Sequence, residues 1–251
     1  MSAKSQSLTI AANLAELARV MQMIDDFSTR MSIGAADVSA LHLALEEIVT
    51  NVITHGYQGD ATRTLSVQIE AIAADRIRAS VTDEATAYNP LARPEVNTSL
   101  PLEARPVGGL GVHLVRKLMD VCLYERREGH NVFTVERQLG RAAGAAASMS
   151  IAASRLAASA TLTLTGRLDG LSSPDLERQV SALITSGVRT LTFDLSGLEY
   201  VSSAGLRVFI IAAKKLKAGG GEARFTHLTP AVYEVFHISG LLTALGVVPR
   251  A

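Results

Sequence analysis

The chain has 251 residues, 48% of them apolar, which is enough for two domains of ordinary size with a core in each. Its formal net charge of zero argues against nucleic-acid binding by bulk electrostatics, so we expect no nucleic-acid partner. The single cysteine, Cys122, excludes an internal disulfide. No segment approaches the roughly 20 apolar residues of a membrane span, and the N-terminus lacks the apolar core of a signal peptide. We therefore expect a cytoplasmic protein without a membrane partner.

The two halves of the chain differ in charge and are separated by a run of small residues. Residues 1–140 carry 13 Lys+Arg against 17 Asp+Glu, and residues 141–251 carry 11 against 7. The stretch GRAAGAAA (140–147) is unpatterned, and a new β-type pattern opens at Met149. We predict a first domain at 1–140, a linker at 141–148 and a second domain at 149–251.

Apolar periodicity and turn residues predict mixed helices and strands in the first half. In chain order they are a helix from an Asn13 cap to Met31, a helix capped by Asp37 and ending at Gly56, strands at 64–72 and 77–82, a long loop at 89–108, a helix at 110–120, and a hairpin of strands 121–126 and 131–138.

The second half alternates strand and helix, which predicts a small α/β sheet with helices on its face. The expected elements are a strand at 160–166, a helix capped by Ser173, a strand at 189–195, a helix at 205–218, a strand at 223–226 and a helix starting at Pro230.

Polar residues on the second helix form the first candidate site. Glu47 and Asn51 stand four residues apart, so they project from one side of the helix. A carboxylate and a carboxamide there could serve as a general base and as a ligand for a hard cation. On spacing alone, a solvated helix face is the better explanation of the pair.

Two further elements follow in an order that favours a nucleotide site, although the chain has no P-loop sequence. Asp83 ends a strand, and Gly108, Gly109 and Gly111 stand where the long loop meets a helix. Glycines at a helix N-terminus let a phosphate approach closely and expose free N–H groups to it.

These three elements together resemble the GHKL ATPases, and among them the anti-sigma-factor serine/threonine kinases. EEIVTNVITHGY (46–57) resembles the N-box, DEATAYNP (83–90) the adenine-binding box, and GGLGVHLVRKLMD (108–120) the glycine-rich box, over about 10–139. The resemblance implies a GHKL-type α/β sandwich that binds ATP and Mg²⁺. It implies Glu47 as general base, Asn51 as Mg²⁺ ligand, Asp83 as partner of the adenine amino group, and Asn89, Gly108, Gly109 and Gly111 as further nucleotide contacts.

The adenine-binding box departs from the family pattern at two positions. Ala85 replaces the usual glycine, and Asn89 replaces the usual Asp. If position 85 requires a positive φ, Ala85 is strained there, and its methyl group stands where backbone usually approaches the nucleotide. We therefore expect Ala85 to weaken nucleotide binding.

A serine pair in the second half forms the second candidate site. FDLSGLEYVSSAGLRVFIIAAKKL (193–216) runs from a strand into an amphipathic helix that starts near Ser202 and Ser203. Serine is a favoured helix N-cap, and this role alone can explain the presence of one of the two serines. The context also resembles the STAS domain of anti-sigma-factor antagonists over about 149–247. That resemblance implies a STAS-type α/β domain with Ser203 as phosphoacceptor and Ser202 as second choice.

The two resemblances together predict a partner-switching regulator. Its first domain would be a serine protein kinase acting on a STAS domain, its own or a partner's, with a sigma factor as a further partner. A homodimer and a contact between the two domains of one chain are left open. The first alternative is a catalytically silent scaffold that sequesters a partner. A histidine-kinase-type ATPase is less favoured, because His42 and His55 lie within the Glu47 helix itself.

Overall fold

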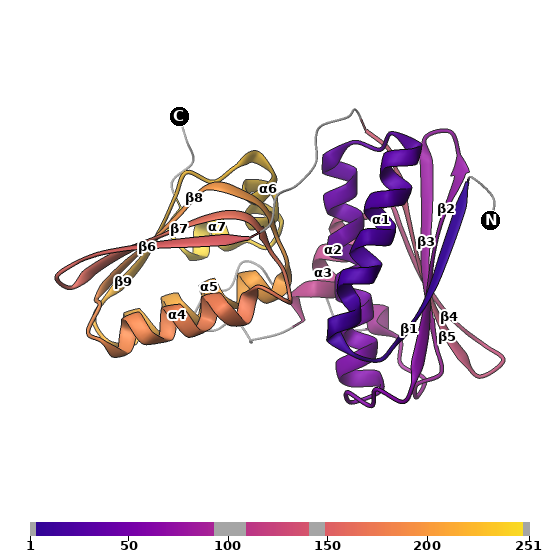
Figure 1. The fold of residues 1–251 in the computed structure, drawn as a ribbon, viewed down its shortest axis with the longest axis horizontal. Helices are drawn as coiled ribbons and strands as arrows, with labels where there is room; N and C mark the ends of the chain where they lie inside the picture. The colour runs from indigo at the N-terminus through magenta and orange to yellow at the C-terminus, as the bar shows by residue number, and fades with distance from the viewer. Residues whose placement is uncertain (1–3, 93–108, 141–148, 248–251) are drawn as a thin grey trace. The chain divides into compact units, whose positions relative to one another are not determined.

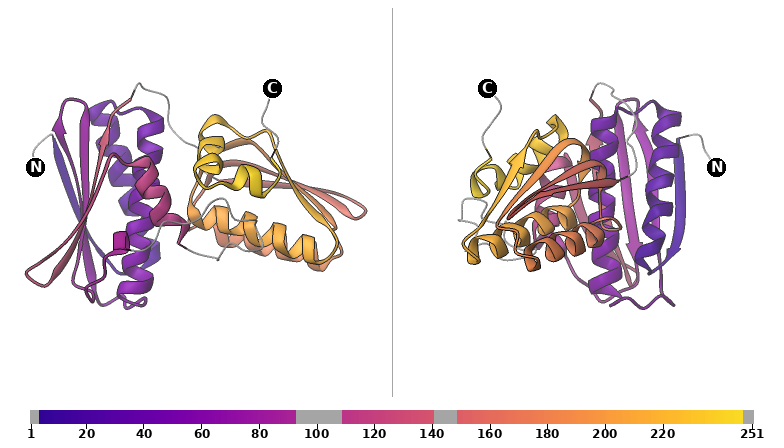
Figure 2. Two further views of the ribbon diagram at one scale, coloured as in Figure 1. Left: turned by 180° about the vertical axis from the view of Figure 1, so that it is seen from behind. Right: turned by 60° about the vertical axis from the view of Figure 1, so that its left-hand side comes forward.

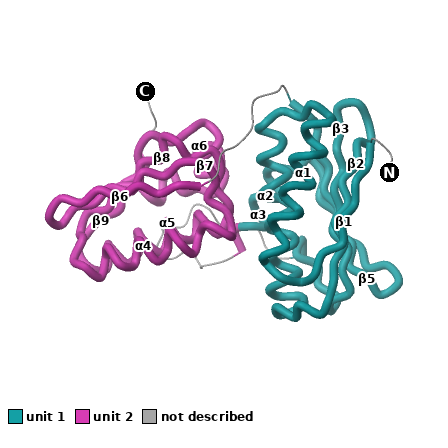
Figure 3. Tube along the Cα trace, viewed as in Figure 1, with its two compact units in different colours: residues 1–95, 111–145 teal, residues 96–110, 146–251 magenta. Residues whose placement is uncertain are grey.

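The computed structural model describes residues 4–92, 109–140 and 149–247 (Figure 1). Residues 4–92 and 111–140 belong to one compact unit, and residues 149–247 belong to a second (Figure 3). The expected linker at 141–148 and most of the expected loop at 89–108 lie outside the described residues. The domain boundaries therefore stay a prediction.

The first unit contains a five-stranded antiparallel sheet in the order β1-β2-β3-β5-β4. Its elements are β1 (Ser5–Ala11), η1 (Leu14–Glu16), α1 (Leu17–Met31), α2 (Ala35–Asn51), η2 (Val52–Gly56), β2 (Thr64–Ala73), β3 (Arg76–Asp83), η3 (Pro90–Ala92), α3 (Leu110–Leu118), β4 (Val121–Arg127) and β5 (His130–Gln138).

The core of the first unit lies between one face of this sheet and helices α1, α2 and α3 (Figures 1 and 2). Alternation in β2 buries Val67 and Ile69, and the α1 side chains of Ile24 and Phe27 are fully buried as well. Helix α2 is buried along most of its length, because it packs against α1 and against strands β3 and β5 of the sheet. The expected α/β sandwich is confirmed.

The first unit departs from the prediction at β1 and at Asp37, whereas the Asn13 cap is confirmed. Strand β1 was not expected; it pairs with β2 along its whole length. Asn13 caps the short η1, where its Oδ1 accepts from Ala15 N at 3.0 Å, so α1 starts only at Leu17. Asp37 does not cap α2, which begins at Ala35 after Gly34. Its carboxylate instead accepts hydrogen bonds from Arg137 Nε and Gly140 N.

The second unit contains a four-stranded sheet in the order β6-β7-β8-β9, antiparallel between β6 and β7 and parallel thereafter. Its elements are β6 (Ser150–Leu156), β7 (Ser159–Leu168), α4 (Ser173–Thr185), β8 (Thr190–Val201), α5 (Ser203–Ala218), β9 (Glu222–Thr226), α6 (Pro230–Ile238) and α7 (Leu241–Ala244). Strand and helix alternate as expected. Ser173 is the first residue of α4 rather than its cap, since the N-cap is Ser172.

Four phenylalanines join the sheet of the second unit to its helices. The Phe193 ring from β8 stacks on Phe225 from β9 at a centroid distance of 5.0 Å, and Phe209 from α5 meets Phe193 edge-on at 5.1 Å. Phe236 from α6 reaches both Phe209 and Phe225. These contacts fix α5 and α6 against the strands and so set the direction in which α5 starts.

Candidate functional site

The N-box residues lie at the end of α2, where the helix widens into a π-turn. Glu47 is 8% exposed and Asn51, one turn later, is partly exposed. The chain continues without a break into η2, which ends at Gly56. Such π-turns are frequent at functional sites, because they change the direction in which side chains point.

Glu47 lies directly against the glycine-rich box. A Cβ atom added to Gly111, in the first turn of α3, would lie 2.6 Å from Glu47 Cδ. No side chain fits there unless Glu47 moves, so position 111 needs a glycine for space. The carboxylate of the candidate base and the N-terminal turn of α3 are therefore adjacent.

The other end of the N-box meets the adenine-binding box. Ala85 is 7% exposed, and its Cβ lies 3.0 Å from the position that a Cβ of residue 56 would occupy. The φ angle of Ala85 is not positive, so the strain considered for this position does not arise. The methyl group points to Gly56, and the missing side chain of that glycine makes room for it.

Asp83, at the end of β3, is 5% exposed and accepts two hydrogen bonds on the same oxygen. Its Oδ1 accepts from Ala85 N at 2.8 Å, which forms a tight turn of the backbone, and from Asn131 Nδ2 at 2.8 Å. Asn131 stands directly across from Asp83 in the β3–β5 register and is itself 6% exposed.

Residues of the β4–β5 hairpin support this pair, and the sequence did not single them out. Tyr124 OH and Arg126 Nη1 both donate to Asn131 Oδ1, at 2.7 and 2.8 Å. Arg126 Nη1 also donates to the Ala85 carbonyl at 2.8 Å. The predicted hairpin of strands 121–126 and 131–138 already indicates that Tyr124 and Arg126 are neighbours of Asn131.

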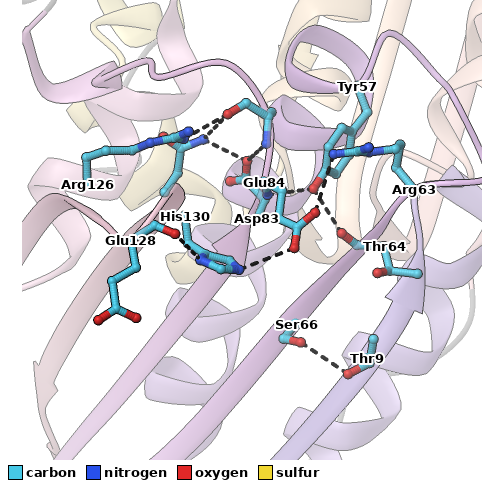
Figure 4. Close-up of polar contacts among 12 residues, drawn as sticks. Thr9, Tyr57, Arg63, Thr64, Ser66, Asp83, Glu84, Arg126, Glu128 and His130 are labelled. Carbon is cyan, nitrogen blue, oxygen red and sulfur yellow. Dashed lines mark hydrogen bonds and ion pairs between the residues drawn. The ribbon is translucent and has the colours of Figure 1, made fainter.

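A second group of polar side chains contacts the backbone turn at residues 83–85 (Figure 4). Tyr57 OH accepts from Glu84 N at 2.7 Å and donates to Thr64 O at 2.9 Å. Burial raises the pKa of the Tyr57 phenol above its ordinary value. The Glu84 carboxylate lies 3.3 Å from His130 Nε2 and 3.5 Å from Arg63 Nη2, all three being substantially exposed.

The remaining predicted nucleotide contacts that the structure describes form no hydrogen bond with Asp83 or Ala85. Asn89 is exposed, and its Oδ1 accepts from Leu91 N at 2.9 Å at the start of η3. Gly109 is exposed, with a φ of 78° that favours glycine. Gly108 lies outside the described residues. The structure therefore places Gly111 against Glu47 in α2, and Ala85, two residues after Asp83, against Gly56 at the end of η2.

The two candidate phosphoacceptors differ in environment. Ser202 is the N-cap of α5, fully buried, with its Oγ accepting from Gly205 N at 3.4 Å. Its own N–H donates to Leu168 O at 2.9 Å. Ser203 is the first residue of α5 and is partly exposed. The capping role thus falls to Ser202.

Family models match both units. Residues 10–136, just over half of the chain, match the histidine kinase-like ATPase domain, and residues 151–249 match the Mlab, STAS domain. The chain therefore belongs to the histidine kinase-like ATPase family and carries a STAS domain after it. Its architecture is that of an anti-sigma-factor kinase-like unit joined to an antagonist-like unit.

Relatives in sequence exist for each unit, and a solved structure resembles part of the chain. A putative anti-sigma factor antagonist BtrV of Bordetella bronchiseptica is 41% identical over 80 residues, covering 32% of this chain and 69% of that protein. A serine-protein kinase RsbW of Halalkalibacterium halodurans is 27% identical over 117 residues, covering 45% and 70%. The solved RsbU and RsbW domains of Rv1364c from Mycobacterium tuberculosis match with a TM-score of 0.40 and 20% identity over 55% of this chain and 33% of that one.

No helix within residues 4–92, 109–140 and 149–247 combines the length and apolar character that crossing a membrane requires.

Proposed function

We propose that the first unit binds Mg·ATP and transfers phosphate to a serine of a STAS domain, either its own or that of a partner protein. The observation that carries this proposal is that one continuous segment, α2 with η2, contacts the glycine-rich box at Glu47 and the adenine-binding box at Gly56. Asn51 lies between these two contacts. A nucleotide held by both boxes would therefore lie along the segment that carries the base and the metal ligand.

Each residue has a role that its surroundings support. Asp83 would accept from the adenine amino group, and the first turn of α3 around Gly111 would offer N–H groups to phosphate oxygens. Asn51 would hold Mg²⁺ by its carboxamide oxygen. No cluster of three His, Cys, Asp or Glu side chains that could hold a metal occurs in the described ranges, so phosphates and water would complete the shell.

Glu47 would accept the proton of the attacking serine hydroxyl while the γ-phosphoryl group leaves ADP. Phosphoryl transfer depends mainly on positioning and charge stabilisation, which this arrangement can supply. We assign the phosphoacceptor to Ser203, because Ser202 is buried and its hydroxyl caps α5. The phosphate would add about two negative charges to the surface at the start of α5, which can break a protein–protein contact.

The partner-switching role follows from these chemical roles together with the relatives. In this proposal the partners are a STAS-domain protein and a sigma factor. The silent scaffold remains the alternative, because Ala85 departs from the family pattern. The fit of its methyl group against Gly56 favours a site that still binds nucleotide.

Titration calorimetry of the full chain with ATP, with and without Mg²⁺, tests the proposal. We expect Mg²⁺-dependent binding that Asn51→Ala weakens about tenfold or more, which is the value of one ligand to a charged partner. Gln22→Ala, which removes an exposed amide on α1, is the matched control. Ala85→Gly should leave the affinity nearly unchanged, because the methyl group points to Gly56 rather than to the nucleotide. Absence of binding at millimolar ATP in both the parent and Ala85→Gly would reject the kinase and leave the scaffold.

A further inference from the structure

Ser203 and Arg207 stand four residues apart on α5. Ser203 is the first residue of the helix and is partly exposed, and Arg207 is exposed one turn later. Side chains at this spacing are neighbours on the surface of a helix. Within residues 149–247 the Arg207 guanidinium has no hydrogen bond or ion pair. The phosphoacceptor of the proposed function therefore has an uncommitted cation beside it.

The charges along α5 leave this cation to an anion at position 203. The helix contains one arginine and three lysines, and its sequence has no acidic residue. No carboxylate of α5 therefore competes for Arg207. An anion that precedes a cation at this spacing is in the favourable order, because it also meets the positive end of the helix dipole.

A second arginine lies near the start of α5, but it faces away from the helix. Arg167 directly precedes Leu168 in β7. A Cβ atom added to Gly205 in α5 would lie 2.7 Å from Leu168 Cγ, so the Leu168 side chain faces α5. Neighbouring strand residues point to opposite faces of a sheet, and the Arg167 guanidinium accordingly lies 3.8 Å from the centroid of the Tyr200 ring. The phosphoacceptor thus has Arg207, and not Arg167, on its own helix face.

A phosphate at position 203 would match the guanidinium in charge and in shape. The N–H groups of arginine form a planar fork that can bind two phosphate oxygens at once, and such charge-assisted hydrogen bonds are among the stronger ones. Because Arg207 has no other contact to give up within the described part of the second unit, the fork is available to the phosphate.

We propose that Arg207 is the residue that binds the phosphate of Ser203. Phosphorylation then changes the surface at the start of α5 in two ways, because it adds negative charge and withdraws the free guanidinium from a partner. This inference rests on the phosphoacceptor assigned in the proposed function.

Phosphorus NMR of the full chain with phosphoserine at position 203 tests the inference. The phosphate is installed by the chain's own reaction with Mg·ATP or, independently of that reaction, by incorporation of phosphoserine during synthesis. A guanidinium beside the phosphate favours the dianion, so Arg207→Gln should raise the second phosphate pKa, which is ordinarily about 6. We expect a rise of about 0.3–0.7 at low salt, the range for exposed ion pairs, and a smaller rise at high salt.

Lys215→Gln is the matched control, because it removes one charge from an exposed position on the same helix. Lys215 lies roughly 18 Å from Ser203 along the helix axis, so the phosphate pKa should stay within about 0.1 of the parent value. Arg207→Lys keeps the charge but loses the planar fork, and its phosphate pKa should lie between those of the parent and Arg207→Gln. The Arg207 Nε–H signal in nitrogen–proton spectra should move when the parent is phosphorylated, which a purely structural role would not cause.

The two ways of installing the phosphate separate the outcomes. A raised phosphate pKa in Arg207→Gln alone, with a moved Arg207 Nε–H signal in the phosphorylated parent, supports the inference. Equal pKa values in Arg207→Gln and Lys215→Gln would overturn it, whichever way the phosphate was installed. If the incorporated phosphoserine shows the effect of Arg207 but Mg·ATP places no phosphate on Ser203, the assigned phosphoacceptor is wrong, whereas the binding of the phosphate by Arg207 stands.

Discussion

Two adjacent serines at the start of α5 differ in exposure, although they are neighbours in the sequence. Ser202 is fully buried and caps the helix, whereas Ser203 is partly exposed at its first position. The buried serine therefore serves stability, and the partly exposed one is the phosphoacceptor of the proposed function.

Removing the two hydroxyls separately should separate these properties. We expect Ser202→Ala to lower the free energy of unfolding of the second unit by about 1 kcal/mol, through loss of the N-cap and of a buried hydroxyl. Ser203→Ala, the matched neighbour, should stay within about 0.5 kcal/mol of the parent. Denaturant unfolding of the two variants measures both values. Equal destabilisation by the two substitutions would show that the capping role is wrongly assigned.

Residues with strong local context could be predicted from the sequence, and residues that act across strands could not. Glu47, Asp83 and Gly111 belong to short boxes whose order points to a nucleotide. In the structure Glu47 lies against Gly111, and Ala85 of the adenine-binding box lies against Gly56. Asn131 meets Asp83 only through the β3–β5 register, which joins positions 48 residues apart. No local pattern marks such a residue.

The effect of Ala85 also depends on a residue outside the adenine-binding box. From the box alone, an alanine in place of glycine suggests strain or obstruction. The partner that accommodates the methyl group, Gly56, lies at the end of another element. Compensation of this kind becomes visible only when both backbones are in place.

At the scale of elements, a buried carboxylate joins three parts of the first unit. Asp37, in the first turn of α2, is 2% exposed; its Oδ1 accepts from Arg137 Nε at 2.7 Å and its Oδ2 from Gly140 N at 2.8 Å. Arg137 also donates to the Leu118 carbonyl at the end of α3. Helices α2 and α3, which carry Glu47 and Gly111, are thereby tied to the end of β5.

Asp37→Ala should therefore destabilise the first unit strongly, because Arg137 and Gly140 N lose their shared acceptor. We expect a loss of about 3–5 kcal/mol, as for other broken buried ion pairs. Thermal unfolding, with hydrogen exchange of α2 peptides as a local readout, measures the effect. Asp26→Ala removes an exposed carboxylate on α1 and is the control. Similar melting and exchange in the two variants would contradict the role given to Asp37.

Short elements with few apolar residues were the hardest to predict. Strand β1 has the sequence SQSLTIA, in which only Ile10 is fully buried, so its alternation is faint. Its existence depends on pairing with β2, a tertiary contact. Helix α2 was predicted well because its apolar residues extend over four turns.

At the scale of the whole molecule, a kinase-like unit and an antagonist-like STAS unit belong to one chain. A linker of the eight residues 141–148 would reach roughly 25–30 Å when fully extended. A tether of that length would keep the two units at high effective concentration. The opposite net charges of the two halves would favour their encounter at low salt.

Transfer within one chain makes a kinetic prediction. The first-order rate constant of phosphorylation should not change when the protein is diluted over a hundredfold range. Incubation with Mg·ATP, followed by quantitative mass spectrometry at each concentration, measures it. A rate constant that rises in proportion to protein concentration would show transfer between chains, and phosphate found only on an added STAS protein would make the attached unit a docking element.

The measurement that tests the central claim most directly is mass spectrometry of the full chain after incubation with Mg·ATP, comparing the parent with Glu47→Ala and Ser203→Ala. The account predicts phosphate on Ser203 in the parent and none at that position in Ser203→Ala. It predicts a rate about 10²–10⁴-fold lower in Glu47→Ala, which still binds ATP. An unphosphorylated parent, alone and with a separate STAS protein, or equal rates in the parent and Glu47→Ala, would contradict it.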